Sequence, residues 1–149
     1  MIEMWFDGCT EPKNPGGHSA YGVVIKNGDE TLLRESGYCG YGANSSNNVA
    51  EYSGFIAGLN FLLEKGLNKE RILIRGDSNL VIQQQFGTWK IKKGIYLPLA
   101  YKAKKLIKKF RMIAGEWIPR EENGICDCLS KQILYDKGIK FMIQPEGKG

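Results

Sequence analysis

Four acidic residues stand where separate elements of the chain are expected to begin or end, and together they predict a metal site. They are Asp7, Glu51, Asp77 and Asp127. Three or four carboxylates in one place repel one another strongly, and a divalent cation offsets that repulsion best. Mg²⁺ prefers oxygen ligands and keeps waters and substrate phosphates in its shell. Two such ions, about 3.5–4 Å apart, can activate a water and stabilise a leaving oxygen.

Each acid taken alone also has a purely structural explanation. Asn48-x-x-Glu51 resembles a capping box, in which the glutamate serves its own helix. Asp77 could be the N-cap of the helix that follows it. Asp127 could complement a helix dipole, and Asp7 could be an ordinary turn residue. The joint placement of the four is what favours a site.

The elements that must position these acids follow from hydrophobic periodicity and turn residues. Strands are expected at residues 2–7, twice within 18–42 around Asn27-Gly28, at 71–77 and at 112–118, with a loop at 8–17. Helices are expected at 49–65, 78–85, 97–110 and 123–137. This order predicts an α/β protein with a mixed five-stranded sheet, its first three strands antiparallel, and helices on both faces. Ligands of such sheets lie beyond the carboxyl ends of strands, where Asp7 and Asp77 are expected.

Length and composition predict one soluble globular domain. The chain has 149 residues, of which 42% are hydrophobic, and no apolar run is long enough to span a membrane. We expect a domain at residues 1–137 and a tail at 138–149, in which "FMI" would add a short strand before a flexible end. The start "MIEMWFDG" does not resemble a signal peptide, which favours the cytoplasm by default.

The four cysteines predict packing and not a metal site. Cys126-x-Cys128 lacks the C-x-x-C spacing of common zinc sites, and positions two apart on a helix face different ways. We therefore expect small thiols that are buried or half-buried, including Cys9 and Cys39.

The positive charge is concentrated in one segment. Nine of the 21 basic residues, and no acidic residue, lie between Lys90 and Arg111. The rest of the chain has 12 basic and 16 acidic residues, a net charge of −4. Such asymmetry favours a polyanionic partner, and the alternative is a solvated helix face.

Four stretches, in the same order and at compatible spacing, resemble type 1 ribonuclease H. They are "FDGCTEPKNPGGHSAYG", "SSNNVAEYSGFIAGL", "IRGDSNLVIQQ" and "EWIPREENGICDCLSK", and the match runs from about residue 3 to 135. The resemblance implies a ribonuclease H-like fold and cleavage of the RNA strand of RNA–DNA hybrids, which leaves 5′-phosphate and 3′-hydroxyl ends. It also implies two Mg²⁺ ions per site, for which Mn²⁺ would be a substitute. The family's four metal-binding carboxylates match Asp7, Glu51, Asp77 and Asp127.

The resemblance also suggests residues that bind the substrate. Asn14 and Ser46 fall near groups that contact the nucleic-acid backbone, and Asn47 and Asn48 match residues that read the RNA minor groove. Asparagine donates and accepts hydrogen bonds, as does the 2′-hydroxyl that distinguishes RNA from DNA. N-capping is the alternative role for these two asparagines.

The chain departs from many family members in lacking a long basic insertion between the second and last helices of the half that carries Asp77. Binding of the hybrid would then rest on Trp89, Lys90, Lys92, Lys93 and the lysine-rich face that follows Leu99. Trp89 could stack on a sugar or base while the lysines contact phosphates. A core position is the alternative for Trp89.

The chain also lacks the histidine that the family often carries on a flexible loop before its last acid. Its one histidine, His18, lies in the first Pro-Gly-Gly stretch and receives no catalytic role. Arg120 stands where that histidine is expected. Arginine stays protonated and cannot act as a base, but it can bind a phosphate oxygen and stabilise charge on the transferring group.

The sequence therefore favours a monomeric, metal-dependent endoribonuclease whose partner is an RNA–DNA hybrid, with no membrane and no small-molecule cofactor. A non-catalytic nucleic-acid-binding module is one alternative, although four retained carboxylates would repel phosphate. Another nuclease of the superfamily is a second alternative. The exonuclease branch commonly has an acid where Cys9 stands, and integrase-like proteins usually lack the Asn-Asn-x-x-Glu start. Cleavage of double-stranded RNA, which also has a minor groove lined by 2′-hydroxyls, stays open.

Overall fold

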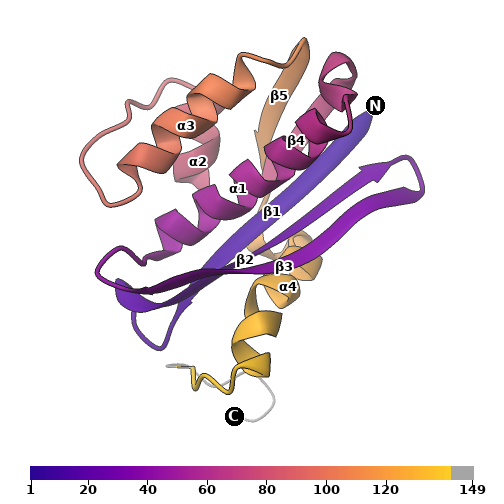
Figure 1. Cartoon of the computed structure of the whole chain (residues 1–149). Coiled ribbons are helices and arrows are strands. Elements are labelled where there is room, and N and C mark those ends of the chain that lie inside the picture. The colour runs from indigo at the N-terminus through magenta and orange to yellow at the C-terminus, as the bar shows by residue number, and fades with distance from the viewer. Residues whose placement is uncertain (142–149) are drawn as a thin grey trace.

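The computed structural model describes residues 1–141 of the chain (Figure 1). The strands are β1 Ile2–Glu11, β2 Gly16–Asn27, β3 Glu30–Gly42, β4 Arg71–Gly76 and β5 Met112–Trp117. The helices are α1 Asn47–Glu64, α2 Asn79–Phe86, α3 Leu97–Ile107 and α4 Gly124–Asp136, with short 3-10 turns at Leu67–Lys69 and Arg120–Glu122. Most of the predicted tail strand at "FMI" lies outside the described residues.

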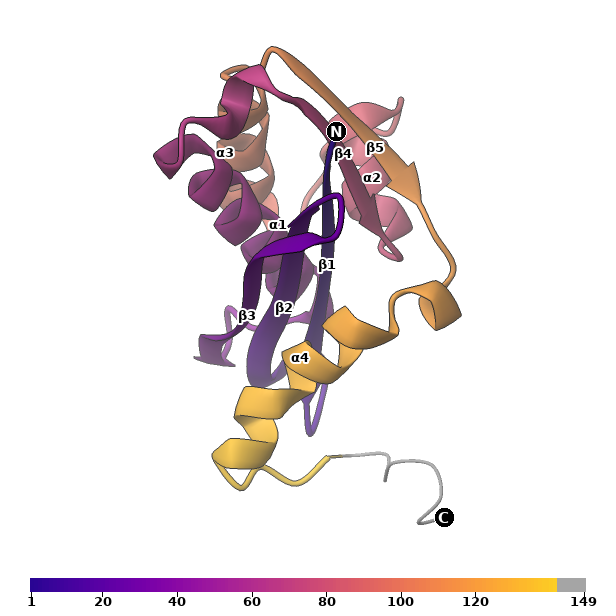
Figure 2. The same ribbon diagram turned by 90° about the vertical axis from the view of Figure 1, so that its right-hand side faces the viewer.

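The five strands form one mixed sheet in the order β3-β2-β1-β4-β5. β1, β2 and β3 pair antiparallel, and β4 and β5 run parallel to β1. Helices α1, α2 and α3 lie on one face, whereas α4 crosses the other face over β1, β2 and β3 (Figure 2). The predicted fold class is therefore confirmed. Within residues 1–141, no helix has the length and hydropathy needed to cross a bilayer.

The first strand is longer than predicted. We expected it to end at Asp7 because the next residues are rich in glycine and proline, but β1 continues to Glu11. Its pairing with β2 runs from Ile2↔Asn27 to Glu11↔His18, whereas its pairing with β4 ends at Phe6↔Gly76. Asp7 therefore lies in mid-strand, at the point where β1 loses its parallel neighbour.

Alternation along β1 divides its side chains between the two helical layers. Met4 and Phe6 are fully buried in the core shared with α1, where Phe55 lies 5.3 Å from the Phe6 ring. Trp5 and Cys9 face α4 instead, and the Cys9 thiol donates to the Ser130 carbonyl. Both helical layers therefore cover β1 there, and its apolar residues pack on both faces of the sheet.

The cysteines are unpaired, and their placement agrees with packing except at one position. Cys9 and Cys126 are buried and Cys39 is half-buried. Cys128 is exposed, contrary to the prediction, because it lies on the side of α4 that faces away from the sheet.

Candidate active site

Three of the four predicted acids converge in the structure. Asp7, Glu51 and Asp77 each place a carboxylate oxygen within 4.8 Å of the others, and among residues 1–141 this is the group suited to hold a metal ion. Asp77 follows the last residue of β4, one position beyond the Phe6↔Gly76 pair. The acids meet where β1 and β4 part, because the strands stop pairing there.

A close contact between α1 and β1 brings Glu51 to this point. At Gly8, a Cβ atom would lie 2.4 Å from the Glu51 nitrogen and 2.5 Å from the Ala50 carbonyl carbon. Real side chains do not tolerate such distances, so only glycine lets the start of α1 rest against the strand. The absence of a side chain at Gly8 therefore decides how deep Glu51 reaches.

The structure excludes the capping explanations for two acids. Ser46 is the N-cap of α1 and accepts a hydrogen bond from the Val49 nitrogen at 3.2 Å. Glu51 consequently lies in the second turn, beyond the reach of a capping box. Ser78, not Asp77, caps α2 through the Val81 nitrogen at 3.3 Å. Neither carboxylate is needed to satisfy its helix.

Burial and mutual repulsion perturb two of the acids. Burial, and next the charge of Asp77, raise the pKa of Asp7 to about 7. Burial, and next the charge of Asp7, hold the pKa of Glu51 well above its usual range. The Glu51 Oε2 atom is buried and has no hydrogen-bond partner among the described residues. Three carboxylates with an orphaned buried oxygen are a donor set that fits a divalent cation.

Asn123 fixes Asp77 and was missed as a site residue by the sequence analysis. Its side-chain nitrogen donates to the Phe6 carbonyl at 2.8 Å and to Asp77 Oδ1 at 3.2 Å. Asn123 is only 2% exposed and precedes α4, where it makes no side-chain capping bond. The sequence signal for this role was that Asn123 lies one helical turn before Asp127. From the sequence alone, we interpreted Asn123 only as the start of a helix.

Asp127 lies at the edge of the acid group. It is in the first turn of α4 and pairs with Lys131, one turn further on, at 3.2 Å. Its charge still contributes to the raised pKa of Asp7, after the larger effects of burial and Asp77. Helix α4 lies directly against β2 at Gly22. A Cβ atom there would lie 2.5 Å from the Cys126 carbonyl oxygen, so only glycine permits this contact.

The residues predicted to contact the nucleic acid come together where the loop after β1 meets the start of α1. The Asn14 side-chain oxygen accepts from the Asn47 backbone nitrogen at 3.0 Å, and Gly16 donates to the Ser45 carbonyl at 2.9 Å. Ser46 is partly buried and uses its hydroxyl as the cap of α1. Asn47 and Asn48 are exposed, so capping leaves both side chains available.

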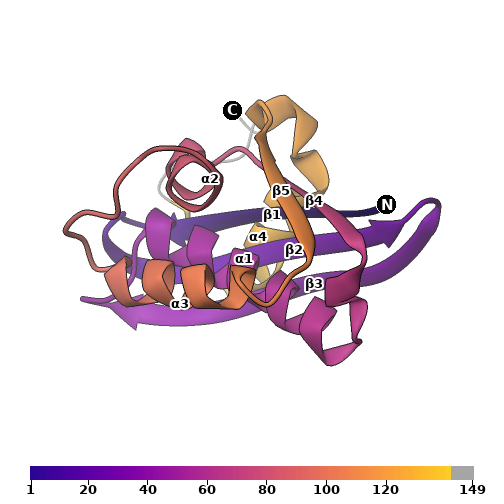
Figure 3. The same ribbon diagram turned by 90° about the horizontal axis from the view of Figure 1, so that it is seen from above.

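The basic connector between α2 and α3 borders a hollow on the face of the sheet that α1, α2 and α3 cover. Figures 1 and 3 show this connector as a loop that stands out from the helices. A cavity of about 560 Å³ there is lined by Leu80, Gln84, Trp89, Lys90, Lys92 and Tyr96. Trp89 is 48% exposed, which excludes the core position, and Lys93 is exposed as well. Buried Gln84 holds the loop by donating to the Lys90 carbonyl and the Tyr96 hydroxyl.

Arg120 and His18 have different surroundings. Arg120 is exposed in the 3-10 turn between β5 and α4, and within residues 1–141 it makes no ion pair. His18 lies in β2, where its Nδ1 shares a 2.7 Å hydrogen bond with the Tyr38 hydroxyl and its ring lies 4.3 Å from that of Tyr41. These contacts occupy His18 in packing strands β2 and β3 together.

Comparisons with known proteins agree with this geometry. The family model described as reverse transcriptase-like matches residues 5–133. The chain is 38% identical to the bifunctional protein Rv2228c of Mycobacterium tuberculosis over 122 residues, which are 81% of this chain and 32% of that protein. It thus spans about a third of the length of this curated relative. The solved N-terminal RNase H domain of Rv2228c is 32% identical with a TM-score of 0.78, covering 88% of this chain and 96% of that one.

Two further solved structures share the fold over most of the chain. RNase H1 from the halophilic archaeon Halobacterium salinarum is 29% identical, with a TM-score of 0.79 and coverage of 91% of this chain and 98% of that one. LC11-RNase H1, solved in complex with an RNA/DNA hybrid, is 29% identical, with a TM-score of 0.76 and coverage of 87% and 93%.

Proposed function

The chain belongs to the reverse transcriptase-like family of ribonuclease H domains, and on that premise we propose that it is an endoribonuclease that hydrolyses the RNA strand of RNA–DNA hybrids. The observation that carries this proposal is the group of Asp7, Glu51 and Asp77, whose repulsion no cationic side chain of residues 1–141 offsets by an ion pair. The likeness to LC11-RNase H1, which was solved with a hybrid, supports the choice of substrate.

The acid group would hold divalent metal, with Asp127 as a fourth ligand from α4. Two Mg²⁺ ions, or Mn²⁺ ions in their place, would lower the pKa of a bound water and stabilise the charge on the departing 3′-oxygen. Cleavage would then leave 5′-phosphate and 3′-hydroxyl ends. Asn123 keeps the Asp77 carboxylate oriented through its 3.2 Å hydrogen bond. Asp127 would have to exchange its Lys131 partner for this role.

The remaining predicted residues bind and orient the substrate. Arg120 is exposed and unpaired within the described chain, so its guanidinium is free to bind a phosphate oxygen beside the scissile bond. Asn47 and Asn48 would exchange hydrogen bonds with 2′-hydroxyls and bases of the RNA strand. The Asn14 side chain would hold the start of α1 in place. Trp89 and its neighbouring lysines would hold the sugar-phosphate backbone of the hybrid on the face that carries α1, α2 and α3.

One gel assay tests the class and the substrate together. Labelled RNA–DNA hybrid, double-stranded RNA, double-stranded DNA and single strands are each incubated with Mg²⁺, Mn²⁺ or EDTA. We expect cleavage of the hybrid that requires metal, and cleavage of double-stranded RNA would widen the substrate range. Metal-independent cleavage, or no cleavage of the hybrid under any condition, would contradict the proposal.

The Asp7→Asn variant tests the site itself. It removes one carboxylate without changing the size of the side chain, so we expect cleavage to fall by at least about a hundredfold while the hybrid still binds. Asp29→Asn makes the same change in the exposed turn between β2 and β3 and should retain the activity of the unmodified protein. Equal activities of the two variants would place the chemistry elsewhere.

A further inference from the structure

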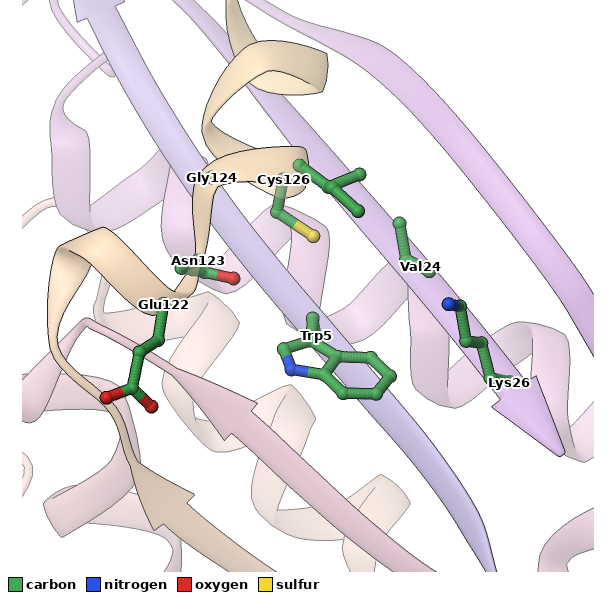
Figure 4. A pocket seen from close by; sticks show the side chains of 8 residues that line it. Trp5, Val24, Lys26, Glu122, Asn123, Gly124 and Cys126 are labelled. Carbon is green, nitrogen blue, oxygen red and sulfur yellow. The ribbon is translucent and has the colours of Figure 1, made fainter. Parts of the chain in front are cut away.

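A second cavity lies on the α4 side of the sheet, beside the acid group, and Asn123 lies between the two. It has a volume of about 310 Å³, at the lower end of the range of small-molecule sites. Strands β1 and β2 contribute Trp5, Val24 and Lys26, and the chain around the start of α4 contributes residues 122–126 (Figure 4). None of the residues predicted to act on a hybrid lines it.

The floor of this cavity is an aromatic surface that its neighbours hold in place. The Trp5 indole lies between Val24 and the start of α4. The Arg75 guanidinium lies 5.4 Å from the centre of the Trp5 ring and is itself fixed by Glu3 and Glu116. Arg75 does not line the cavity, so it stiffens the indole without filling the space. A rigid indole is a surface on which a flat heterocycle stacks.

The inner wall holds a hydrogen-bond acceptor without a partner. Asn123 is 2% exposed, and its side-chain oxygen is buried with no hydrogen-bond donor among the described residues. The amide nitrogen is occupied by Phe6 and Asp77, which fixes the direction of the oxygen. Figure 4 shows that oxygen turned toward the space between Cys126 and Trp5. An unpaired buried acceptor favours an occupant that donates a hydrogen bond.

Charges of opposite sign lie at the two ends of the cavity. Figure 4 shows Glu122 at one end and Lys26 at the other, with the start of α4 along one side. The cavity therefore suits a flat molecule with donors at one end and a single anionic group toward Lys26.

We propose that this cavity binds a purine nucleoside 5′-monophosphate. The purine would stack on Trp5 and donate from its amino group or ring N–H to the Asn123 oxygen. The ribose would extend along the cavity toward β2, and the phosphate would pair with Lys26 at the end opposite Glu122. A single lysine opposite a glutamate favours one phosphate over a chain of two or three.

The test is calorimetric titration of the full chain in EDTA, so that metal at the acid group cannot contribute. AMP and GMP should bind with a Kd below about 1 mM, adenosine more weakly, and inorganic phosphate or free tryptophan not measurably. Amide and side-chain NMR shifts on adding AMP should be largest at Trp5, Asn123 and Gly124.

Two variants locate the binding. Trp5→Leu should weaken AMP by about tenfold or more, whereas Trp5→Phe keeps a ring and should retain most of the affinity. Lys26→Met should weaken AMP about threefold or more and leave adenosine unchanged, and Lys69→Met is the matched control on the turn after α1. No AMP binding at 5 mM (~5 × the expected limit) overturns the proposal. So does binding that Lys26→Met leaves intact, or equal binding of tryptophan.

Discussion

Asp7 and Glu51 are held in surroundings that favour their protonated forms as long as no cation lies between them. Both are buried, with exposed fractions of 4% and 9%, and each lies against a second carboxylate. Burial contributes more to their raised pKa values than the neighbouring charges do. A metal ion that binds the acid group would therefore release protons from it.

This coupling predicts how the stability of the metal-free protein changes with pH. The pKa of Asp7 is about 7 in the folded protein and 3.8 ordinarily, so between these values the folded state holds a proton that the unfolded state has lost. Unfolding is then favoured as the pH rises, and the thermal midpoint in EDTA should fall between about pH 4 and pH 7. Thermal melts across this range measure it.

The same melts carry their own control. Asp7→Asn cannot titrate at this position and should make the profile shallower, with Glu51 left to titrate, whereas Asp29→Asn should leave the slope unchanged. Added Mg²⁺ should raise the thermal midpoint more at pH 8 than at pH 5, because protons and metal compete for the same oxygens. A thermal midpoint independent of pH in EDTA would contradict the raised pKa of Asp7.

Lys131 restrains Asp127 in the absence of metal. The Lys131 ammonium pairs with Asp127 at 3.2 Å, and although partial burial acts to lower the lysine's pKa, the carboxylate outweighs this and raises it. Lys131→Met should free Asp127 and remove a positive charge, which tightens Mn²⁺ binding about two- to fivefold in a calorimetric titration. Lys102→Met changes an exposed lysine of α3 and should have no effect. Weaker binding in Lys131→Met would show that the lysine supports the site.

At the scale of elements, close backbone contacts through glycine decide where the acids lie. Gly8 lets α1 rest on β1, and Gly22 lets α4 rest on β2. The first contact sets how closely Glu51 approaches β1, and the second sets how closely the start of α4, with Asp127, approaches β2. Two helices on opposite faces of the sheet thus bring acids toward the point where β1 and β4 part, with Glu51 inside the acid group and Asp127 at its edge.

Gly8→Ala tests this arrangement. The added Cβ would lie 2.4 Å from the Glu51 nitrogen, so α1 must shift, and we expect a loss of about 1–3 kcal/mol in the free energy of unfolding. Metal affinity should fall as well, because Glu51 moves with the helix. Denaturant unfolding and metal titration measure the two effects. Gly124→Ala is the matched control, since a Cβ there meets nothing within 4 Å, and equal losses in both variants would contradict the close contact.

At the scale of the whole molecule, charge is divided between an acidic site and a basic segment. The connector that carries Trp89, Lys90 and Lys92 joins α2 to α3, on the side of the sheet opposite α4. A buried network anchors the connector, because Gln84 and Gln85 both bond the Tyr52 hydroxyl of α1. A hybrid that reaches both places would span the molecule.

The salt dependence of hybrid binding tests the basic segment. Each lysine that neutralises a phosphate releases counterions, so replacing Lys90 and Lys92 by glutamine should reduce the slope of log K against log[salt] by about 2. Fluorescence anisotropy of a labelled hybrid, with Asp7→Asn protein in EDTA, measures the slope. A protein with only Lys69→Gln should keep the original slope, and an unchanged slope in the double variant would exclude the connector from the interface.

The sequence by itself determined the order of elements and the hairpin at Asn27-Gly28, and it predicted the three acids that the structure brings together, because periodicity, turn chemistry and motif spacing are local properties. It could not determine where β1 ends, since pairing with β2 carries the strand past Asp7 to Glu11. Nor could it choose between capping and site for Glu51, a choice that depends on Ser46. Only tertiary structure decided these points, together with the anchoring of Asp77 by Asn123, because they depend on contacts between segments far apart in the chain.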